Sequence, residues 1–479
     1  EGASWSKISY IELAPPQNVA NAYANIVASR PLPSNHGKPR LYAVYNLNYD
    51  NITSVPGRDD ELGYFYMKSS DDGGVTWSDT RHRVAYPKTW IDQHNTPFNG
   101  STNIMWTVDH IKTDLSTGTV SFAFTKIGAY VQNPPEEIFV MRSTNLLDAA
   151  DPANIKWQML PENVDHGVTC PEYYNYNKTV MEEGHFLPLT SVANRVVIMA
   201  RTSMGYLAAA TRDGSLQPVK GDDHTRVARY WNNTVSGSTS GALLLPLSNV
   251  TTQDGARVLR SGVKHPRGPF TPKQLSPGVW LMLYYNNGGG GWYGRDPYFL
   301  ACGREVDGTF GPLGLPEILW SQPEIVLYDR EYRGGTSGGG YPDFIFVSSE
   351  DEGTGNVTTE VHISAAQKGL PQPAKSRSYL SQVDPMLIQG LLSQHTAAGQ
   401  PKGRVPLISV DATNMNTPLQ RPELPATGNA PLTARQGFSI VFLLNGHHAH
   451  AKPGDTIFQG EYMNLGVGCG QGGLGLNFS

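Results

Sequence analysis

The sequence predicts an all-β protein, because short apolar stretches alternate with turns rich in Gly, Asp and Asn along most of its 479 residues. These stretches are residues 41–47, 63–68, 119–126, 138–143, 196–202, 206–211, 280–285 and 343–347. Composition agrees, since 51 Gly and 35 Pro residues disfavour a helical protein and an aromatic content of 10% favours strands. The spacing fits a sandwich, a barrel or a propeller, and the strand pattern alone leaves these three open.

Charge and hydropathy narrow the classes of partner. The net charge is −5 and no long block of like charges occurs, so we expect neither nucleic acid nor a membrane surface as partner. The sequence has no run of about 18 apolar residues, the length that predicts a membrane-spanning helix. The first residues, EGASWSKISY, lack the basic and apolar regions of a signal peptide, so we expect that a signal was removed or never present.

Glycosylation sequons favour the first of these, a signal that was removed, and hence a secreted, extracellular glycoprotein. Seven Asn-x-Ser/Thr sequons occur in turn-like contexts, and such sites are modified in the secretory pathway. The sequons begin at Asn51, Asn99, Asn177, Asn232, Asn249, Asn356 and Asn477.

Cysteine and histidine usage gives no sign of a metal site. The three cysteines permit at most one disulfide, and the sequence leaves the pairing open among Cys170, Cys302 and Cys469. None of them forms a Cys-x-x-Cys pair. Three of the residues 447–450 are His, but no carboxylate stands at ligand spacing beside them. We therefore expect neither a metal nor a cofactor.

One motif points beyond the strand pattern. Residues 70–77 fit Ser-x-Asp-x-Gly-x-Thr-Trp. We expect a hairpin turn in which Asp72 accepts backbone hydrogen bonds, Gly74 takes a positive φ and Trp77 packs on the sheet. The motif resembles the Asp-box of sialidase-like β-propellers, and residues 211–215 look like a degenerate second copy. The resemblance implies a sialidase-type propeller, for which six blades are expected.

Composition divides the chain into three expected parts. Residues 1–375 carry the repeated strands and are assigned to the propeller. Residues 376–435 are rich in Gln, Pro, Ala and Thr, which predicts a linker or a wrap over the propeller surface with a short helix near 385–393. Residues 436–479 predict a short β segment that resembles part of a concanavalin-like lectin sandwich.

Four residues extend the resemblance to sialidases, because they follow the order of that family's site residues. Glu183 begins a strand, and Arg201 ends the strand that follows. Arg295 precedes a later strand, and Tyr341 stands at the start of another. The resemblance implies that Tyr341 is the catalytic nucleophile, that Glu183 activates it, and that the two arginines bind a substrate carboxylate.

The chemistry of a sialic acid explains this set of residue types. A carboxylate on the anomeric carbon repels an anionic nucleophile, so a neutral phenol activated by a neighbouring carboxylate attacks more readily. Arginine binds a carboxylate through two parallel charge-assisted hydrogen bonds, which lysine reproduces poorly.

The first blade departs from the family pattern, which has an Arg-Ile/Val-Pro motif there. Arg30 is the candidate for that arginine, and Arg267 is a residue that could replace it. Asp50 is the candidate for the general acid. Glu324, at a strand start, is an alternative carboxylate, and His94 stands at a strand end where propeller loops converge on a cleft.

Three functions follow from these residues. The first is an exo-acting, retaining glycoside hydrolase that removes a terminal acidic sugar from a glycan. The second is a propeller polysaccharide lyase that cuts beside a uronic acid, with a base and acid drawn from His94, His110, His185 or Tyr341. The third is a carbohydrate-binding propeller without catalysis, because one fold supports many roles. We favour the hydrolase because Glu183, Arg201, Arg295 and Tyr341 occur in family order.

Overall fold

The computed structural model divides into two units, Glu1–Met415 and Asn416–Ser479. The first unit is described over residues 9–12, 21–48, 61–94, 98, 100–126, 136–162, 167–168, 181–202, 207–216, 249–251, 257–259, 268–285, 297–306, 317–321, 323–327, 341, 343–350, 357–367 and 377–395. The second is described over residues 456–459, 464–470 and 473–478.

The first two sheets of the first unit are four-stranded antiparallel meanders, in which each strand pairs with the next along the chain. Blade 1 contains β1 (Asn21–Leu32), β2 (Lys38–Leu47), β3 (Tyr64–Ser70) and β4 (His82–Val84). Blade 2 contains β5 (Lys112–Asp114), β6 (Thr119–Lys126), β7 (Glu137–Ser143) and β8 (Gln158–Leu160). Strand order therefore follows chain order, as in propeller blades.

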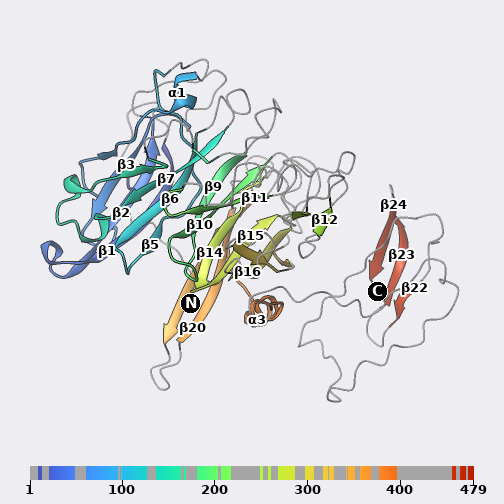
Figure 1. Cartoon of the computed structure of the whole chain (residues 1–479). Helices are drawn as coiled ribbons and strands as arrows, with labels where there is room; N and C mark the ends of the chain where they lie inside the picture. The colour runs from blue at the N-terminus through green and yellow to red at the C-terminus, as the bar shows by residue number, and fades with distance from the viewer. Residues whose placement is uncertain are drawn as a thin grey trace. The chain divides into compact units, whose positions relative to one another are not determined.

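Three further meanders follow (Figure 1). Blade 3 contains β9 (Met181–Pro188), β10 (Arg195–Thr202) and β11 (Leu207–Asp213). In blade 4, the strands β14 (Thr271–Ser276), β15 (Val279–Tyr285), β16 (Tyr298–Val306) and β17 (Glu317–Trp320) pair in chain order, and β18 (Glu324–Leu327) pairs with the first residues of β16. Blade 5 contains β19 (Asp343–Glu350), β20 (Val357–Gln367) and β21 (Arg377–Gln382).

The remaining elements in the described residues of the first unit are short. Strands β12 (Asn249–Thr251) and β13 (Arg257–Leu259) form a separate hairpin. The helices are α1 (Trp90–His94), α3 (Pro385–Ser393) and the 3-10 turns η1 (Pro33–Asn35), η2 (Leu146–Asp148) and η3 (Pro152–Asn154). Helix α3 coincides with the helix expected near 385–393, and Asp384 caps it by accepting a hydrogen bond from the Met386 N–H at 2.8 Å. No helix in the described part of the chain is long and apolar enough to cross a membrane.

Apolar side chains join each blade to the next. Phe65 of blade 1 packs edge-on against Phe122 of blade 2, with the ring centroids 5.1 Å apart. Further buried clusters join blades 2 and 3, blades 3 and 4, and blades 4 and 5. Five meander sheets that pack face to face in chain order make a β-propeller, so the predicted all-β propeller fold is confirmed. The family resemblance implies six blades, but the described residues form five. The sequence shows where turns fall but not how many strands belong to each sheet, so it does not give the number of blades.

The innermost segments of the blades meet one another. Blade 2 begins ahead of β5, where Trp106 pairs with Thr125 of β6. Asn25 of β1 donates a hydrogen bond to the Asp109 carbonyl at 2.9 Å. Asp343 at the start of β19 lies 2.7 Å from Lys273 of β14, so blades 4 and 5 meet as well. Side chains near the amino ends of the inner segments of blades 1, 2, 4 and 5 therefore contact the neighbouring blade.

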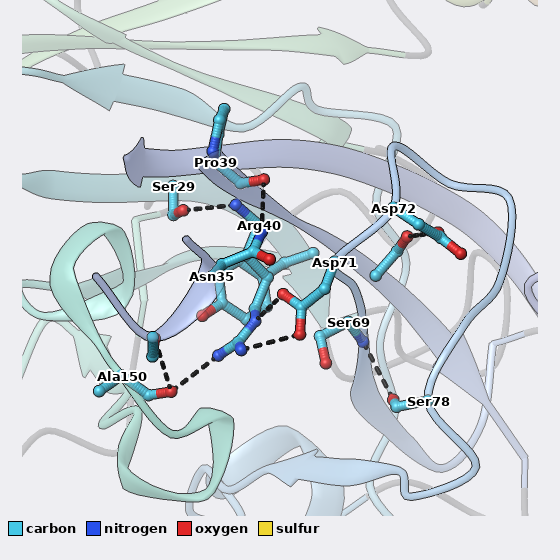
Figure 2. Close-up of polar contacts among 12 residues, drawn as sticks. Ser29, Asn35, Pro39, Arg40, Ser69, Asp71, Asp72, Ser78 and Ala150 are labelled. Atoms are coloured by element: carbon cyan, nitrogen blue, oxygen red, sulfur yellow. Dashed lines mark hydrogen bonds and ion pairs between the residues drawn. The ribbon is translucent and has the colours of Figure 1, made fainter. Parts of the chain in front are cut away.

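The turn between β3 and β4 has the geometry expected from residues 70–77. Gly74 has a φ of +90°, and Asp72 accepts a hydrogen bond from the Thr76 N–H at 2.9 Å. Trp77 packs against the cluster formed by Ala43, Tyr45 and Leu47. Figure 2 shows this turn beside the bidentate pair of Arg40 and Asp71, which fastens it to the sheet with an Nε–Oδ1 distance of 2.6 Å.

The second unit contains one small sheet in its described residues. Strands β22 (Thr456–Gln459), β23 (Asn464–Gly470) and β24 (Gly473–Phe478) form an antiparallel meander. These strands lie in the region 436–479, where a short β segment is predicted.

Candidate active site

Glu183 stands in a distorted part of β9. Its φ is +56°, in the left-handed region that non-glycine residues rarely occupy, and its side chain is fully buried. Strands β9 and β10 pair in register except here, where Glu183 and Gly184 both lie opposite Ala200. An extra residue of this kind re-aims side chains, and strained backbone of this kind gathers at functional sites.

Gly184 explains how this bulge is accommodated. A Cβ on Gly184 would lie 2.7 Å from side-chain carbons of Ile138 in the neighbouring blade, closer than real Cβ contacts occur. Its N–H points to the Thr125 hydroxyl at 3.4 Å. Blade 2 therefore packs directly on the backbone beside Glu183, and only glycine fits at that position.

Three side chains meet the Glu183 carboxylate. The Tyr341 hydroxyl donates a hydrogen bond to Oε1 at 2.5 Å, and the Trp106 indole N–H donates to the same oxygen at 3.2 Å. The Arg201 Nη1 lies 3.1 Å from Oε2. These groups come from blades 5, 2 and 3, so three blades meet at this carboxylate.

Aromatic side chains surround this cluster. Tyr341, Tyr23 and Phe98 are partly exposed and pack against the buried Leu62, Ile104 and Trp106. The rings of Tyr23 and Trp106 are 4.8 Å apart. Tyr23 also has a positive φ, +55°. Tyr341 thus combines a buried carboxylate partner with a partly exposed side chain.

A second polar layer lies two or three residues further along the chain in each of these segments. Asp109 is fully buried and accepts hydrogen bonds from His185 Nδ1 at 2.8 Å and from the Ala123 N–H at 2.7 Å. Burial disfavours its charge, but the Lys112 ammonium and the His185 hydrogen bond outweigh burial and lower the pKa of Asp109 to about 2. Burial also lowers the pKa of His185 to about 4, so His185 is neutral at pH 7.

Asp343 forms the other half of this layer. It lies 2.7 Å from Lys273 Nζ and 3.3 Å from His110 Nε2. Burial raises the pKa of Asp343, but His110 and Lys273 together hold it well below its usual range. The inner segments of blades 2, 4 and 5 are thereby tied together directly beneath Tyr341.

A buried ion pair supports the segment that leads to Trp106. The Lys126 ammonium lies 2.6 Å from Asp92 Oδ2, and both side chains are fully buried. Asp92 Oδ1 accepts a hydrogen bond from the Ile104 N–H at 2.8 Å. The pair therefore fixes the chain two residues before Trp106.

The structure brings together Glu183, Tyr341 and Arg201, three of the four residues expected in family order. The guanidinium of Arg201 is 2% exposed and faces Glu183. The fourth, Arg295, lies outside the described residues, as do Asp50 and Arg267.

Arg30 does not reach this cluster, contrary to the expectation that it binds substrate. It lies seven residues after Tyr23 on β1, a separation of at most about 23 Å along the strand. Its Nη1 pairs with Asp148 of η2 at 2.7 Å. Arg30 therefore joins blades 1 and 2 at the end of the strand remote from Glu183.

Glu324 and His94 also lie elsewhere. Glu324 pairs with Leu300 on the outer side of blade 4, three strands out from β14 and about 14 Å from it. His94 ends α1, where its ring is exposed and stacks on Trp90 at a centroid distance of 4.3 Å. The sequence places both near strand ends but does not show which strand of a blade is innermost.

Only two of the seven expected glycosylation sites lie among the described residues. Asn249 is in β12 and Asn477 is in β24. The other five, Asn51, Asn99, Asn177, Asn232 and Asn356, lie outside the described residues, and glycosylation stays a prediction.

Sequence reasoning missed several residues of the site. Trp106, Asp109, Lys112, Lys273 and Asp343 were not among the candidates. Sequence proximity is the one signal available, because His185 and Asp343 follow Glu183 and Tyr341 by two residues. The partners across blades leave no such pattern in the sequence.

The chain is similar to solved structures only at a distance. A Hadza microbial sialidase aligns with 10% identity and a TM-score of 0.36 over 76% of this chain and 59% of that one. NanB sialidase from Streptococcus pneumoniae aligns with 11% identity and a TM-score of 0.35 over 77% and 63%. This chain therefore spans less than two thirds of either sialidase.

An inulosucrase from Halalkalicoccus jeotgali aligns with 11% identity and a TM-score of 0.33 over 75% of this chain and 80% of that one. No protein-family model and no curated protein sequence matches the chain. At these scores no activity is transferred, and the function is inferred from the site itself.

Proposed function

We propose that the protein is a secreted, sialidase-like glycoside hydrolase that releases a terminal acidic sugar, a sialic acid or a relative, with retention of configuration. The 2.5 Å hydrogen bond from the Tyr341 hydroxyl to the buried Glu183 carboxylate carries this proposal. A phenol held against a carboxylate is an activated neutral nucleophile, and it suits a sugar whose anomeric carbon bears a negative charge.

The first half of the reaction is a displacement at the anomeric carbon. The Tyr341 oxygen forms a bond to that carbon while its proton passes to Glu183. The glycosidic C–O bond breaks, and the leaving oxygen takes a proton from a general acid, for which Asp50 is the candidate. The product of this step is a tyrosyl-linked sugar and the free aglycone.

The second half reverses the first with water. The general acid, which the first half left ionised, accepts a proton from water as the water oxygen bonds to the anomeric carbon and the bond to the Tyr341 oxygen breaks. The proton that Glu183 took up in the first half returns to Tyr341. Two inversions at one carbon give net retention of configuration.

Arg201 supports the reaction in two ways. Its Nη1 lies 3.1 Å from Glu183 Oε2, which stabilises the carboxylate. A guanidinium has five N–H donors, so this contact is compatible with binding of the substrate carboxylate by the same side chain. We assign Arg295 the matching role as the second carboxylate-binding arginine.

A product assay tests the proposal against the lyase alternative. The protein is incubated with glycans that end in sialic acids or uronic acids, and both the released sugar and ultraviolet absorbance are followed. The hydrolase gives a free saturated sugar without new absorbance. An unsaturated uronate, which absorbs in the ultraviolet, would instead establish the lyase and overturn the proposal, and binding without turnover would establish the lectin.

A further inference from the structure

Trp106 shares its carboxylate partner with the proposed nucleophile. Its indole N–H donates to Glu183 Oε1 at 3.2 Å, and the Tyr341 hydroxyl donates to the same atom at 2.5 Å. The Trp106 side chain is 3% exposed, so the indole does not exchange this partner for bulk water. An indole N–H can only donate, and it therefore favours the carboxylate over the carboxylic acid.

The indole is held in place from two sides. Its own backbone pairs with Thr125 through hydrogen bonds of 2.8 and 2.7 Å, and the Thr125 hydroxyl faces the Gly184 N–H. The other side of the ring meets Tyr23 at a centroid distance of 4.8 Å. Trp106 and the Glu183 bulge are thus fastened to the same residue of β6.

From this geometry we propose that Trp106 is a positioning residue for Glu183, an inference that rests on the proposed function. The indole N–H holds Oε1 toward the Tyr341 hydroxyl and keeps Glu183 ionised in the free enzyme. Among the described residues, the charged or titratable groups with assigned contacts to this carboxylate are Arg201 from β10 and Tyr341 ahead of β19. Arg201 meets the other oxygen, and Trp106 meets Oε1 from the side of blade 2.

Trp106→Phe tests the inference because it keeps an aromatic ring and removes the N–H. We expect kcat to fall about tenfold or more while KM changes by less than about threefold. The acidic limb of the pH profile of kcat/KM moves to higher pH by about one unit, because a lost donor raises the pKa of the base. A purely structural role for Trp106 leaves that limb in place.

Trp280→Phe is the matched control. Trp280 is also buried, and its indole N–H donates to another carboxylate oxygen, Glu305 Oε1, at 2.8 Å. Its loss removes the same kind of hydrogen bond from blade 4 without touching Glu183. We expect an unchanged pH profile for Trp280→Phe.

A second variant covers the case in which Trp106→Phe does not fold. Benzothienylalanine at position 106 has nearly the shape of tryptophan and lacks the N–H, and we expect it to reproduce the pH shift. If either position-106 variant folds and keeps the wild-type kcat and pH profile, and Tyr341→Phe is inactive, the inference about Trp106 is overturned and the proposed function stands. Full activity of Tyr341→Phe would instead overturn the proposed function, and the inference with it.

Discussion

The Tyr341 hydroxyl lies 2.5 Å from Glu183 Oε1, although the two residues are 158 positions apart in the chain. Glu183 belongs to the inner strand of blade 3, and Tyr341 directly precedes the inner strand of blade 5. Their meeting depends on blade 4 and the second polar layer, where Asp343 is held by Lys273 and His110. The proposed catalytic pair is thus a product of how the propeller closes around its centre.

Tyr341→Phe should reduce turnover of a terminal acidic sugar by at least about a thousandfold, because the variant has no oxygen to bond the anomeric carbon. Only one hydroxyl of a partly exposed residue is lost, so the free energy of unfolding should fall by no more than about 2 kcal/mol. Steady-state kinetics and urea unfolding measure the two effects. Turnover near the wild-type value would remove Tyr341 from the mechanism.

Gly184→Ala should destabilise the protein by about 1–3 kcal/mol, because the new methyl group meets Ile138 at 2.7 Å and pushes blade 2 from the Glu183 bulge. Urea unfolding measures this loss. Gly390→Ala is the control, since a Cβ on that residue of helix α3 meets nothing within 4 Å, and alanine favours a helix by up to about 1 kcal/mol. Equal stability of both variants would show that the bulge tolerates a side chain.

The free energy of unfolding should fall as the pH drops from about 6.5 toward 4. The pKa of His185 is about 4 in the folded protein against 6.5 for an unperturbed histidine, so the unfolded chain binds a proton first. This loss amounts to at most about 3 kcal/mol. Asp109 contributes to the pH dependence at lower pH. Because its pKa in the folded protein is about 2, its contribution to the free energy of unfolding is lost only when the pH falls below about 4.

His185→Gln separates these two contributions. Without the imidazole, the loss of stability between pH 6.5 and 4 should become smaller, whereas the loss below pH 4 should remain. Urea unfolding at a series of pH values measures both windows. The same slope in variant and wild type between pH 6.5 and 4 would assign it to other groups.

Arg30→Ala should leave kcat/KM for the sugar substrate unchanged, because the side chain pairs with Asp148 at the far end of β1. The Arg30 side chain is 37% exposed, so we expect its ion pair to contribute less than about 1 kcal/mol to stability. Arg201→Ala provides the contrast, since its guanidinium is buried against Glu183 and its loss should abolish activity. A strong loss of activity in Arg30→Ala would show that Arg30 does take part in substrate binding.

Local signals explain what the sequence could predict. The turn at residues 70–77 follows from short-range rules for Asp, Gly and Thr, and helix α3 follows from the Asp384-Pro385 start. Glu183, Arg201 and Tyr341 were identified by family resemblance. That resemblance supplies their order along the chain, but not the bulge that aims Glu183 or the indole that holds it.

The sequence could not predict the features of the site that depend on contacts between blades. Asp109 and His185 are 76 positions apart, and their hydrogen bond exists only because two inner strands are neighbours. Arg30 was misplaced for the same reason, since its sequence context does not show which end of β1 faces the site. Each strand passes from one end of its blade to the other, so a difference of a few residues moves a side chain to the opposite end.

The most direct test is mass spectrometry of the enzyme quenched during turnover of a slow substrate with a terminal acidic sugar. The account predicts that the proteolytic peptide containing Tyr341 gains the mass of one glycosyl residue, and that Tyr341→Phe shows no such gain. Release of the saturated sugar while that peptide stays unmodified, with the label on another residue, would contradict the account.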